Sequence, residues 1–133
     1  MAKSDPKPKK KTKKRETGDI GEGVVSKYLV NKGFSVIEHN YWRPWGEIDI
    51  IAEKDAKIRF IEVKTVSRVT KTGLRPEENM HKNKLLRLNR AIQTYLLEKK
   101  LKETKEWQID LACVYLDFET RRAKVELFEN IIL

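Results

Sequence analysis

The sequence has one cysteine, two histidines and no apolar run long enough to span a bilayer. A single cysteine excludes an internal disulfide and is typical of a reducing compartment. Cys113 lies in the apolar run LACVYL, where we expect a buried structural thiol. His39 and His81 have no partner at the spacing of metal ligands, so both are expected at the surface. The amino-terminal residues lack the apolar stretch of a signal peptide, and we predict a cytoplasmic protein without a membrane partner.

The positive charge of the sequence is concentrated at one end. Residues 1–15 hold eight Lys or Arg and one Asp, a net charge of +7, whereas residues 16–133 have a net charge of only +2. The first segment also lacks apolar periodicity, so it cannot bury enough surface to offset the entropy lost on ordering. We therefore predict a disordered basic tail over residues 1–15 and one folded domain over residues 16–133. The tail either only keeps the protein soluble or binds phosphate backbones without sequence preference.

Hydrophobic periodicity predicts an α/β domain with the element order α-β-β-β-α-β-β. Apolar residues of segments 17–33 and 80–101 recur every three or four positions, which is typical of helices. Gly33 suits the end of the first helix. Strands are predicted over residues 34–39, 46–53, 57–65, 107–117 and 123–131, with loops over residues 40–44 and 66–79.

Two of the predicted strands, GEIDIIA and FIEVKT, contain acidic side chains in otherwise apolar runs. Alternation places Asp49 on one face of its strand with Glu47 and Ile51, and places Glu62 and Lys64 together on one face of the next strand. If the strands pair through the turn KDAK, Asp49 and Glu62 come side by side, where two carboxylates repel each other. A divalent cation together with Lys64 would compensate this repulsion. The alternative is a structural ion pair with Lys64, although burying three charges for stability alone is seldom favourable.

These two strands and three further stretches carry a resemblance to a known family. The further stretches are GEGVVSKYLVNKGF in the first helix, KLLRLNRAIQTYL in the second helix and QIDLACV in the fourth strand. Together they resemble the YraN-like uncharacterised proteins of the PD-(D/E)xK nuclease superfamily, similar in fold to archaeal Holliday-junction resolvases. The resemblance begins at about Thr17 and implies a restriction endonuclease-like mixed β-sheet flanked by helices. Val66 and the pair Gln108 and Ile109 depart from it, because the family usually has a basic residue and an Arg-Phe pair there.

The resemblance implies a metal-dependent endonuclease that hydrolyses phosphodiester bonds in DNA, with branched or otherwise structured DNA as a candidate substrate. Asp49, Glu62 and Glu22 would hold Mg²⁺ or Mn²⁺ through hard oxygen ligands, and Lys64 would orient the attacking water. A solvated helix charge is an equally good interpretation of Glu22. The alternative function is a non-catalytic nucleic-acid-binding module that retains the nuclease fold. Resolvases of this superfamily act as dimers, so a homodimer is expected by analogy.

Basic side chains near the acidic strands are candidates for contacts with nucleic acid. Arg43 lies between Trp42 and Trp45 just before the first acidic strand, and aromatic rings beside a cation can stack on unpaired bases. Tryptophans at such a junction more often cover the edge of a core. One interpretation of Asp110, in the apolar fourth strand, is structural. Further candidates for nucleic-acid contacts are Arg68 in the loop, and Lys84 and Arg87 in the second helix, where Lys84 alternatively extends into water.

Overall fold

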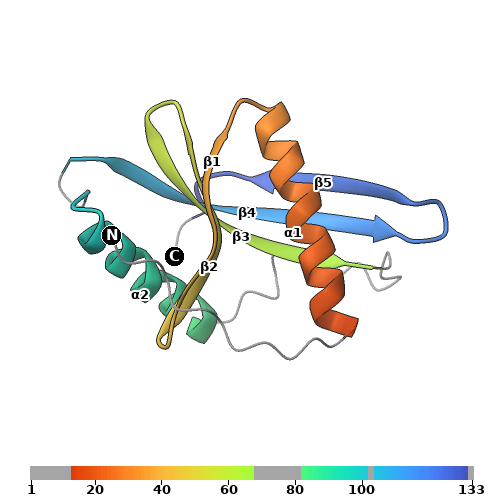
Figure 1. The fold of residues 1–133 in the computed structure, drawn as a ribbon, viewed down its shortest axis with the longest axis horizontal. Helices are drawn as coiled ribbons and strands as arrows, with labels where there is room; N and C mark the ends of the chain where they lie inside the picture. Colours follow the sequence, from red (N-terminus) through yellow and green to blue (C-terminus); the bar gives the residue numbers. More distant parts are fainter. Residues whose placement is uncertain (1–12, 68–81, 102–103, 132–133) are drawn as a thin grey trace.

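The computed structural model describes residues 13–67, 82–101 and 104–131, which form a five-stranded sheet with one helix on each face (Figure 1). The elements are α1 (Lys13–Asn31), β1 (Ser35–Arg43), β2 (Gly46–Lys54), β3 (Lys57–Val66), α2 (Lys82–Glu98), β4 (Glu106–Asp117) and β5 (Arg122–Phe128). The strands lie in the order β1-β2-β3-β4-β5, with β3 and β4 parallel and the other pairs antiparallel. Within the described ranges, neither helix is both long and apolar enough to cross a membrane. The predicted fold class and element order are confirmed, and the architecture is the restriction endonuclease-like one that the resemblance implied.

Each face of the sheet packs on one helix through its own hydrophobic core. The core under α1 consists of Val25, Leu29, Phe34, Ile50, Ala52, Ile61, Val63, Ala112, Val114 and Leu116. The core under α2 consists of Tyr41, Ile48, Ile51, Ile58, Phe60, Leu88, Ala91, Ile92, Tyr95, Leu96 and Ile109. The strands β3 and β4 contribute to both cores because both of their faces are covered, which accounts for their nearly continuous apolar runs.

The helix α1 ends where the sequence predicts, but it begins earlier than predicted. Gly33 follows the helix with a φ of 90°, and the Phe34 N–H donates a hydrogen bond to the Leu29 carbonyl at 2.9 Å. This geometry closes the last turn and suits glycine. The helix begins at Lys13, which we had assigned to the basic tail. Residues 1–12 lie outside the described part of the chain, so their disorder stays a prediction.

The first strand is longer than the sequence predicts. β1 continues through residues 40–43, where we expected a loop. Arg43 pairs with Gly46, so the β1–β2 hairpin closes on only Pro44 and Trp45. The loop prediction was wrong because Tyr41 and Trp42 favour a strand once β2 supplies hydrogen-bonding partners.

The regular alternation of β2 is interrupted at Asp49. Ile48 and Ile51 both pack in the core under α2, although strict alternation would place them on opposite faces. Across the hairpin, Asn40 has a φ of 51°, and neither Asn40 nor Asp49 is among the paired positions of these two strands. The expectation that Asp49 shares a regular strand face with Ile51 is therefore wrong. Asp49 lies at a local irregularity of the sheet.

Arg43 belongs to a buried polar cluster that ties the β1–β2 hairpin to the end of α2. Its side chain pairs with Oε2 of Glu98 at 2.5 Å, donates to the Trp42 carbonyl at 2.8 Å and lies 4.6 Å from the Tyr41 ring centroid. The Tyr41 hydroxyl donates to the other Glu98 oxygen at 2.5 Å. Arg43 itself is only 7% exposed. This corrects the expectation that Arg43 contacts nucleic acid, because its guanidinium is enclosed by the fold.

Glu98→Gln should lower the free energy of unfolding by about 1 kcal/mol at neutral pH, a value reduced for the partial exposure of Glu98. Burial alone would raise the pKa of Glu98, but hydrogen bonds from Tyr41 and Arg43 hold this pKa below its ordinary value. Such a carboxyl stabilises the folded state above its unfolded pKa, and the contribution is lost as the pH falls through the folded pKa. The difference between wild type and Glu98→Gln should therefore shrink below about pH 4 in urea unfolding. A difference that stays constant down to lower pH would contradict this role.

Candidate active site

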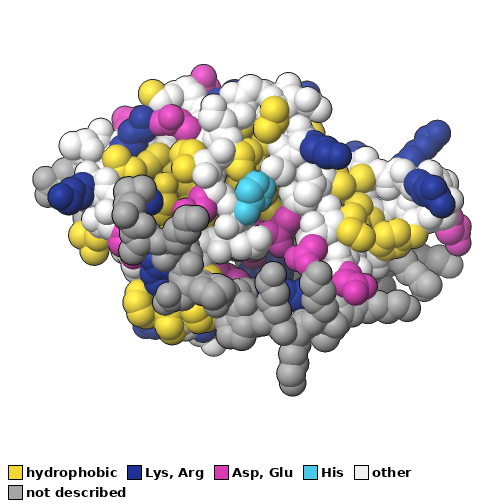
Figure 2. All heavy atoms as spheres, in the orientation of Figure 1, with side chains coloured by type: hydrophobic (Ala, Val, Ile, Leu, Met, Phe, Trp, Pro, Cys, Tyr) yellow, Lys and Arg dark blue, Asp and Glu magenta, His cyan; other side chains and the backbone are white. Residues whose placement is uncertain are grey.

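An open cavity of about 930 Å³ lies between the amino-terminal half of α1, the strands β2 and β3, and the start of α2. Figure 2 shows acidic side chains gathered over the amino-terminal half of α1. The structure brings to this cavity all four predicted catalytic residues and one predicted nucleic-acid contact. They are Glu22, Asp49, Glu62, Lys64 and Lys84.

Neighbouring strands bring the two acidic side chains of the sheet together. Ile50 of β2 pairs with Ile61 of β3, so Asp49 and Glu62 are the next positions along the two strands. The regular pairing ends here, and the Val63 N–H instead donates a hydrogen bond to Oδ2 of Asp49 at 2.8 Å. The prediction that Asp49 and Glu62 come side by side is confirmed.

Two lysines balance part of this negative charge, in different ways. The Nζ atom of Lys84 lies 2.6 Å from Oε1 of Glu62, a residue that is only 4% exposed. Burial alone would lower the pKa of Lys84, but the Glu62 carboxylate raises it above its ordinary value. Burial and the neighbouring Lys84 lower the pKa of Lys64. Lys84 is therefore held as a cation on Glu62, whereas Lys64 releases its proton more readily than an ordinary lysine.

The negative charge of Asp49 is compensated only in part. Burial raises the pKa of Asp49 well above its ordinary value, and the carboxylates of Glu62 and Glu22 raise it further. The hydrogen bond from the Val63 N–H opposes this effect only in part. A positively charged group near Asp49 would therefore be bound favourably.

Glu22 reaches the cavity because Gly21, which has no side chain, lets α1 approach the Thr65 side chain of β3 closely. Gly21 is buried, and a Cβ atom built on it would lie 1.9 Å from Oγ1 of Thr65. Thr65 directly follows Lys64 in β3, so this contact places the amino-terminal half of α1 beside the acidic pair. Glu22 is half-buried and lines the cavity, which favours a role in the site over a solvated helix charge.

The chemistry of the donor set suits a hard divalent cation. Asp49, Glu62 and Glu22 offer only carboxylate oxygens, the ligands that Mg²⁺ and Mn²⁺ prefer. In residues 13–67, 82–101 and 104–131, no three Asp, Glu, His or Cys side chains converge closely enough to form a ready-made metal site. Lys84 already engages one oxygen of Glu62, so a cation would compete with it. The partly compensated charge of Asp49 is the observation that fits a cation best.

Besides Arg43, three residues are predicted to contact nucleic acid, and they lie in different surroundings. Lys84 is half-buried and pairs with Glu62 in the wall of the cavity, so it does not simply extend into water, and a contact with nucleic acid there stays a prediction. Arg87 is exposed about one turn further along α2, so a contact with nucleic acid there stays a prediction. Arg68 lies outside the described residues, and its role also stays a prediction.

The cavity also contains residues that the sequence did not single out as part of a site. Asn40, Glu47 and Thr65 line it, as does Phe118 in the β4–β5 turn, which is 56% exposed. The available signal for Asn40 was weak, since asparagine tolerates a positive φ in many turns. No local pattern identifies Phe118, because its position beside the acids depends on the packing of β4 against β3.

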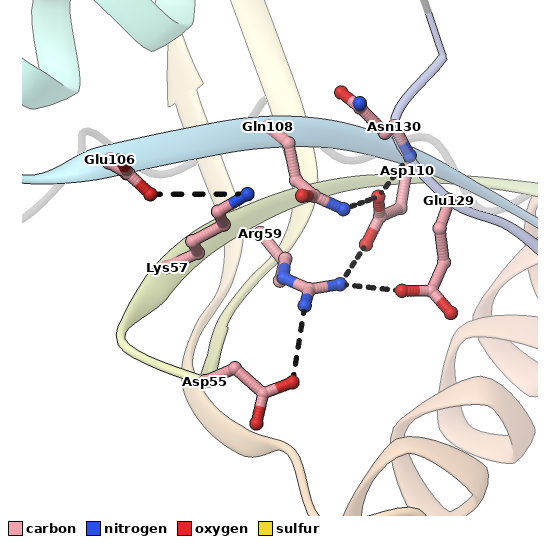
Figure 3. Close-up of polar contacts among 8 residues, drawn as sticks. All are labelled: Asp55, Lys57, Arg59, Glu106, Gln108, Asp110, Glu129 and Asn130. Atoms are coloured by element: carbon pink, nitrogen blue, oxygen red, sulfur yellow. Dashed lines mark hydrogen bonds and ion pairs between the residues drawn. The ribbon is translucent and has the colours of Figure 1, made fainter.

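Asp110 belongs to a separate polar cluster and does not line the cavity (Figure 3). It is fully buried and accepts hydrogen bonds from Gln108 Nε2 at 2.8 Å, the Asn130 N–H at 2.8 Å and Arg59 Nη1 at 3.3 Å. Arg59 also pairs with Glu129 at 2.8 Å. The cluster ties the segment after β5 to β3 and β4. The structural interpretation of Asp110 is therefore confirmed.

Comparison with known protein families shows to which family the chain belongs. Residues 21–114 match the model of the uncharacterised protein family UPF0102. The chain belongs to the UPF0102 family. The UPF0102 match includes all the residues that line the cavity between Glu22 and Lys84, and it confirms the YraN-like resemblance.

UPF0102 relatives match along most of their own length. A UPF0102 protein of Moorella thermoacetica is 37% identical over 117 residues, which cover 88% of this chain and 95% of the relative. One of Campylobacter fetus is 35% identical over 114 residues, covering 86% and 91%. One of Corynebacterium efficiens is 33% identical over 122 residues, covering 91% and 95%. Because UPF0102 is an uncharacterised family, an activity has to be argued from the site itself.

Gly21→Ala should lower the free energy of unfolding by about 1–3 kcal/mol, because the added methyl group overlaps Thr65 and pushes α1 away from β3. Gly23→Ala is the matched control on the same helix, since nothing lies within 4 Å of a Cβ atom there. Alanine at that position should be neutral or should stabilise the protein by up to about 1 kcal/mol. Urea unfolding of the two variants measures both effects. Equal free-energy changes would contradict the close contact between α1 and β3.

Proposed function

We propose that this protein is a metal-dependent endonuclease that hydrolyses phosphodiester bonds in DNA, with branched or otherwise structured DNA among its substrates. The observation that carries the proposal is the meeting of Asp49 and Glu62, from adjacent strands, with two lysines in one open cavity. This combination of acids and ammonium groups is suited to binding a divalent cation and a phosphate next to each other.

The residues that would hold Mg²⁺ or Mn²⁺ are Asp49, Glu62 and Glu22. A bound divalent cation supplies a more acidic water and neutralises charge that develops on the phosphate. The cavity walls keep these carboxylates partly or fully buried, which strengthens their attraction for cations relative to exposed acids. The excess of acids over lysines among the five site residues leaves room for additional positive charge.

Lys64 and Lys84 would act on the phosphate group. Lys64 lies two residues after Glu62 in β3 and lines the same cavity, so its ammonium can donate hydrogen bonds to a phosphate oxygen and orient the attacking water. Lys84 is held on Glu62 at 2.6 Å. If a cation were bound at Glu62, the Lys84 ammonium would be available to a second phosphate oxygen. The negative charge of a phosphate in this position would then be compensated by the two lysines and by the cation.

One observation favours a second candidate function, a nucleic-acid-binding module without catalysis. The Glu62 carboxylate is already neutralised by Lys84, so half of the acidic pair is satisfied without a metal. A protein that uses the cavity only to bind phosphate would retain both lysines and the fold. The two functions differ in whether added Mg²⁺ or Mn²⁺ produces cleavage.

Mn²⁺ should bind weakly to the wild type, and the double variant Asp49→Asn with Glu62→Gln should lose this binding because two of the three hard ligands become neutral amides. Isothermal titration calorimetry measures the affinity. The matched control is Asp55→Asn with Glu53→Gln, which removes the same charges from the same hairpin outside the cavity. Equal Mn²⁺ binding by the wild type and the Asp49→Asn, Glu62→Gln variant would show that the site is misassigned.

Lys64→Ala should reduce DNA cleavage at least about a hundredfold, because an ammonium that stabilises developing charge is removed. DNA affinity should stay within a few-fold of wild type, since affinity is spread over many phosphate contacts. The assay incubates labelled single-stranded, duplex, flap and four-way DNA with and without Mg²⁺ or Mn²⁺.

Lys57→Ala is the control for this experiment, because Lys57 is on the same strand but pairs with Glu106 away from the cavity. This variant should cleave like the wild type. A wild type that binds DNA and cleaves none of these substrates with either metal would overturn the nuclease proposal and favour the binding module.

A further inference from the structure

Trp45 is an exposed aromatic residue whose side chain is held in place. It lies at the tip of the β1–β2 hairpin and is 43% exposed, whereas Tyr41 on the same hairpin is only 2% exposed. The Trp45 Nε1–H donates a hydrogen bond to Oγ1 of Thr94 on α2 at 2.9 Å, and the Thr94 hydroxyl donates to the Arg90 carbonyl at 2.9 Å. The indole is thus anchored at its polar edge while much of its surface remains in contact with solvent.

Two arginines lie on the part of α2 that borders Trp45. Arg87, Arg90 and Thr94 are spaced by three and four residues, so they lie on one side of the helix. The hairpin tip lies beside α2 (Figure 1), Trp45 contacts Thr94, and a Cβ atom on Gly46 would lie only 2.0 Å from the Arg87 carbonyl oxygen. Arg87 and Arg90 are both exposed. An anchored aromatic ring and two guanidinium groups therefore share one surface.

This surface is connected to the candidate active site by two elements. β2 leads from Gly46 to Asp49, and the four steps along the chain from Trp45 to Asp49 span about 13 Å of extended chain. On α2, Lys84 lines the cavity and Arg87 follows it after about one turn. A single bound strand of nucleic acid can therefore contact the cavity and Trp45 at the same time.

We propose that Trp45 is a stacking platform for an unpaired base of the nucleic acid, with Arg87 and Arg90 binding the adjacent phosphates. Base stacking on aromatic rings combined with a basic surface is the usual way in which proteins hold single strands. The inference rests on the proposed function and narrows its substrate class to DNA with a single-stranded segment beside the cleaved bond. Phe118, also exposed, suits this role less well because Asp117 and Glu119 flank it.

Tryptophan fluorescence tests the platform without any cleavage. In metal-free buffer, a short oligothymidylate should quench the fluorescence of the full-length protein, and Trp45→Phe should remove most of this quenching because Trp42 and Trp107 are half-buried. In fluorescence anisotropy, Trp45→Ala should bind oligothymidylate about tenfold more weakly, while Trp45→Phe keeps most of the affinity. Binding of a fully paired duplex should change little in either variant.

Val30→Ala is the matched control, because it removes a 58% exposed apolar side chain from α1, which packs on the other face of the sheet. It should leave quenching and affinity as in the wild type. Absence of quenching, or equal quenching in Trp45→Phe, overturns the inference, as does a Val30→Ala effect as large as that of Trp45→Ala. Quenching without DNA cleavage supports the platform and overturns the nuclease proposal, whereas cleavage without quenching does the reverse.

Discussion

The repulsion between Asp49 and Glu62 is the constraint around which the cavity is arranged. Both carboxylates lie where a sheet ordinarily buries apolar side chains, and burial makes each negative charge more costly. The Val63 N–H reduces this cost for Asp49, and the Lys84 ammonium reduces it for Glu62. Despite the Val63 hydrogen bond, the pKa of Asp49 stays well above its ordinary value. Burial raises it most, and the neighbouring acids raise it further. The site therefore retains a need for positive charge that the described side chains do not fully meet.

Close contacts at two glycines set how the helices meet this acidic pair. A Cβ atom on Gly21 would overlap Thr65, and one on Gly46 would overlap the Arg87 carbonyl oxygen. The first contact brings α1 and Glu22 to the cavity, and the second keeps α2 beside the hairpin that leads to Asp49. Larger residues at either position would separate a helix from the sheet, and they would alter the cavity without replacing any polar residue in it.

Charged residues serve two different purposes in this fold. Asp110 is enclosed and accepts hydrogen bonds from three donors, and Arg43 is enclosed with its guanidinium on Glu98. Both clusters connect segments distant in sequence and leave little polar capacity for a ligand. Asp49, by contrast, lines an open cavity and lies among other acids. In a structural carboxylate of this fold, hydrogen-bond donors and cations thus largely compensate the negative charge. In the candidate functional carboxylate they compensate it only in part.

The sequence by itself determined the fold class, the end of α1 at Gly33 and the meeting of Asp49 with Glu62. Periodicity is a local property, and the short turn KDAK leaves only a narrow choice of register for the two acidic strands. Only the tertiary structure decided that Arg43 is structural and that Lys84 belongs to the acidic site. Their partners come from segments far away along the chain, and the burial of each ion pair depends on how the helices pack on the sheet. No local pattern records such long-range contacts, so the sequence did not connect either basic residue with its carboxylate partner.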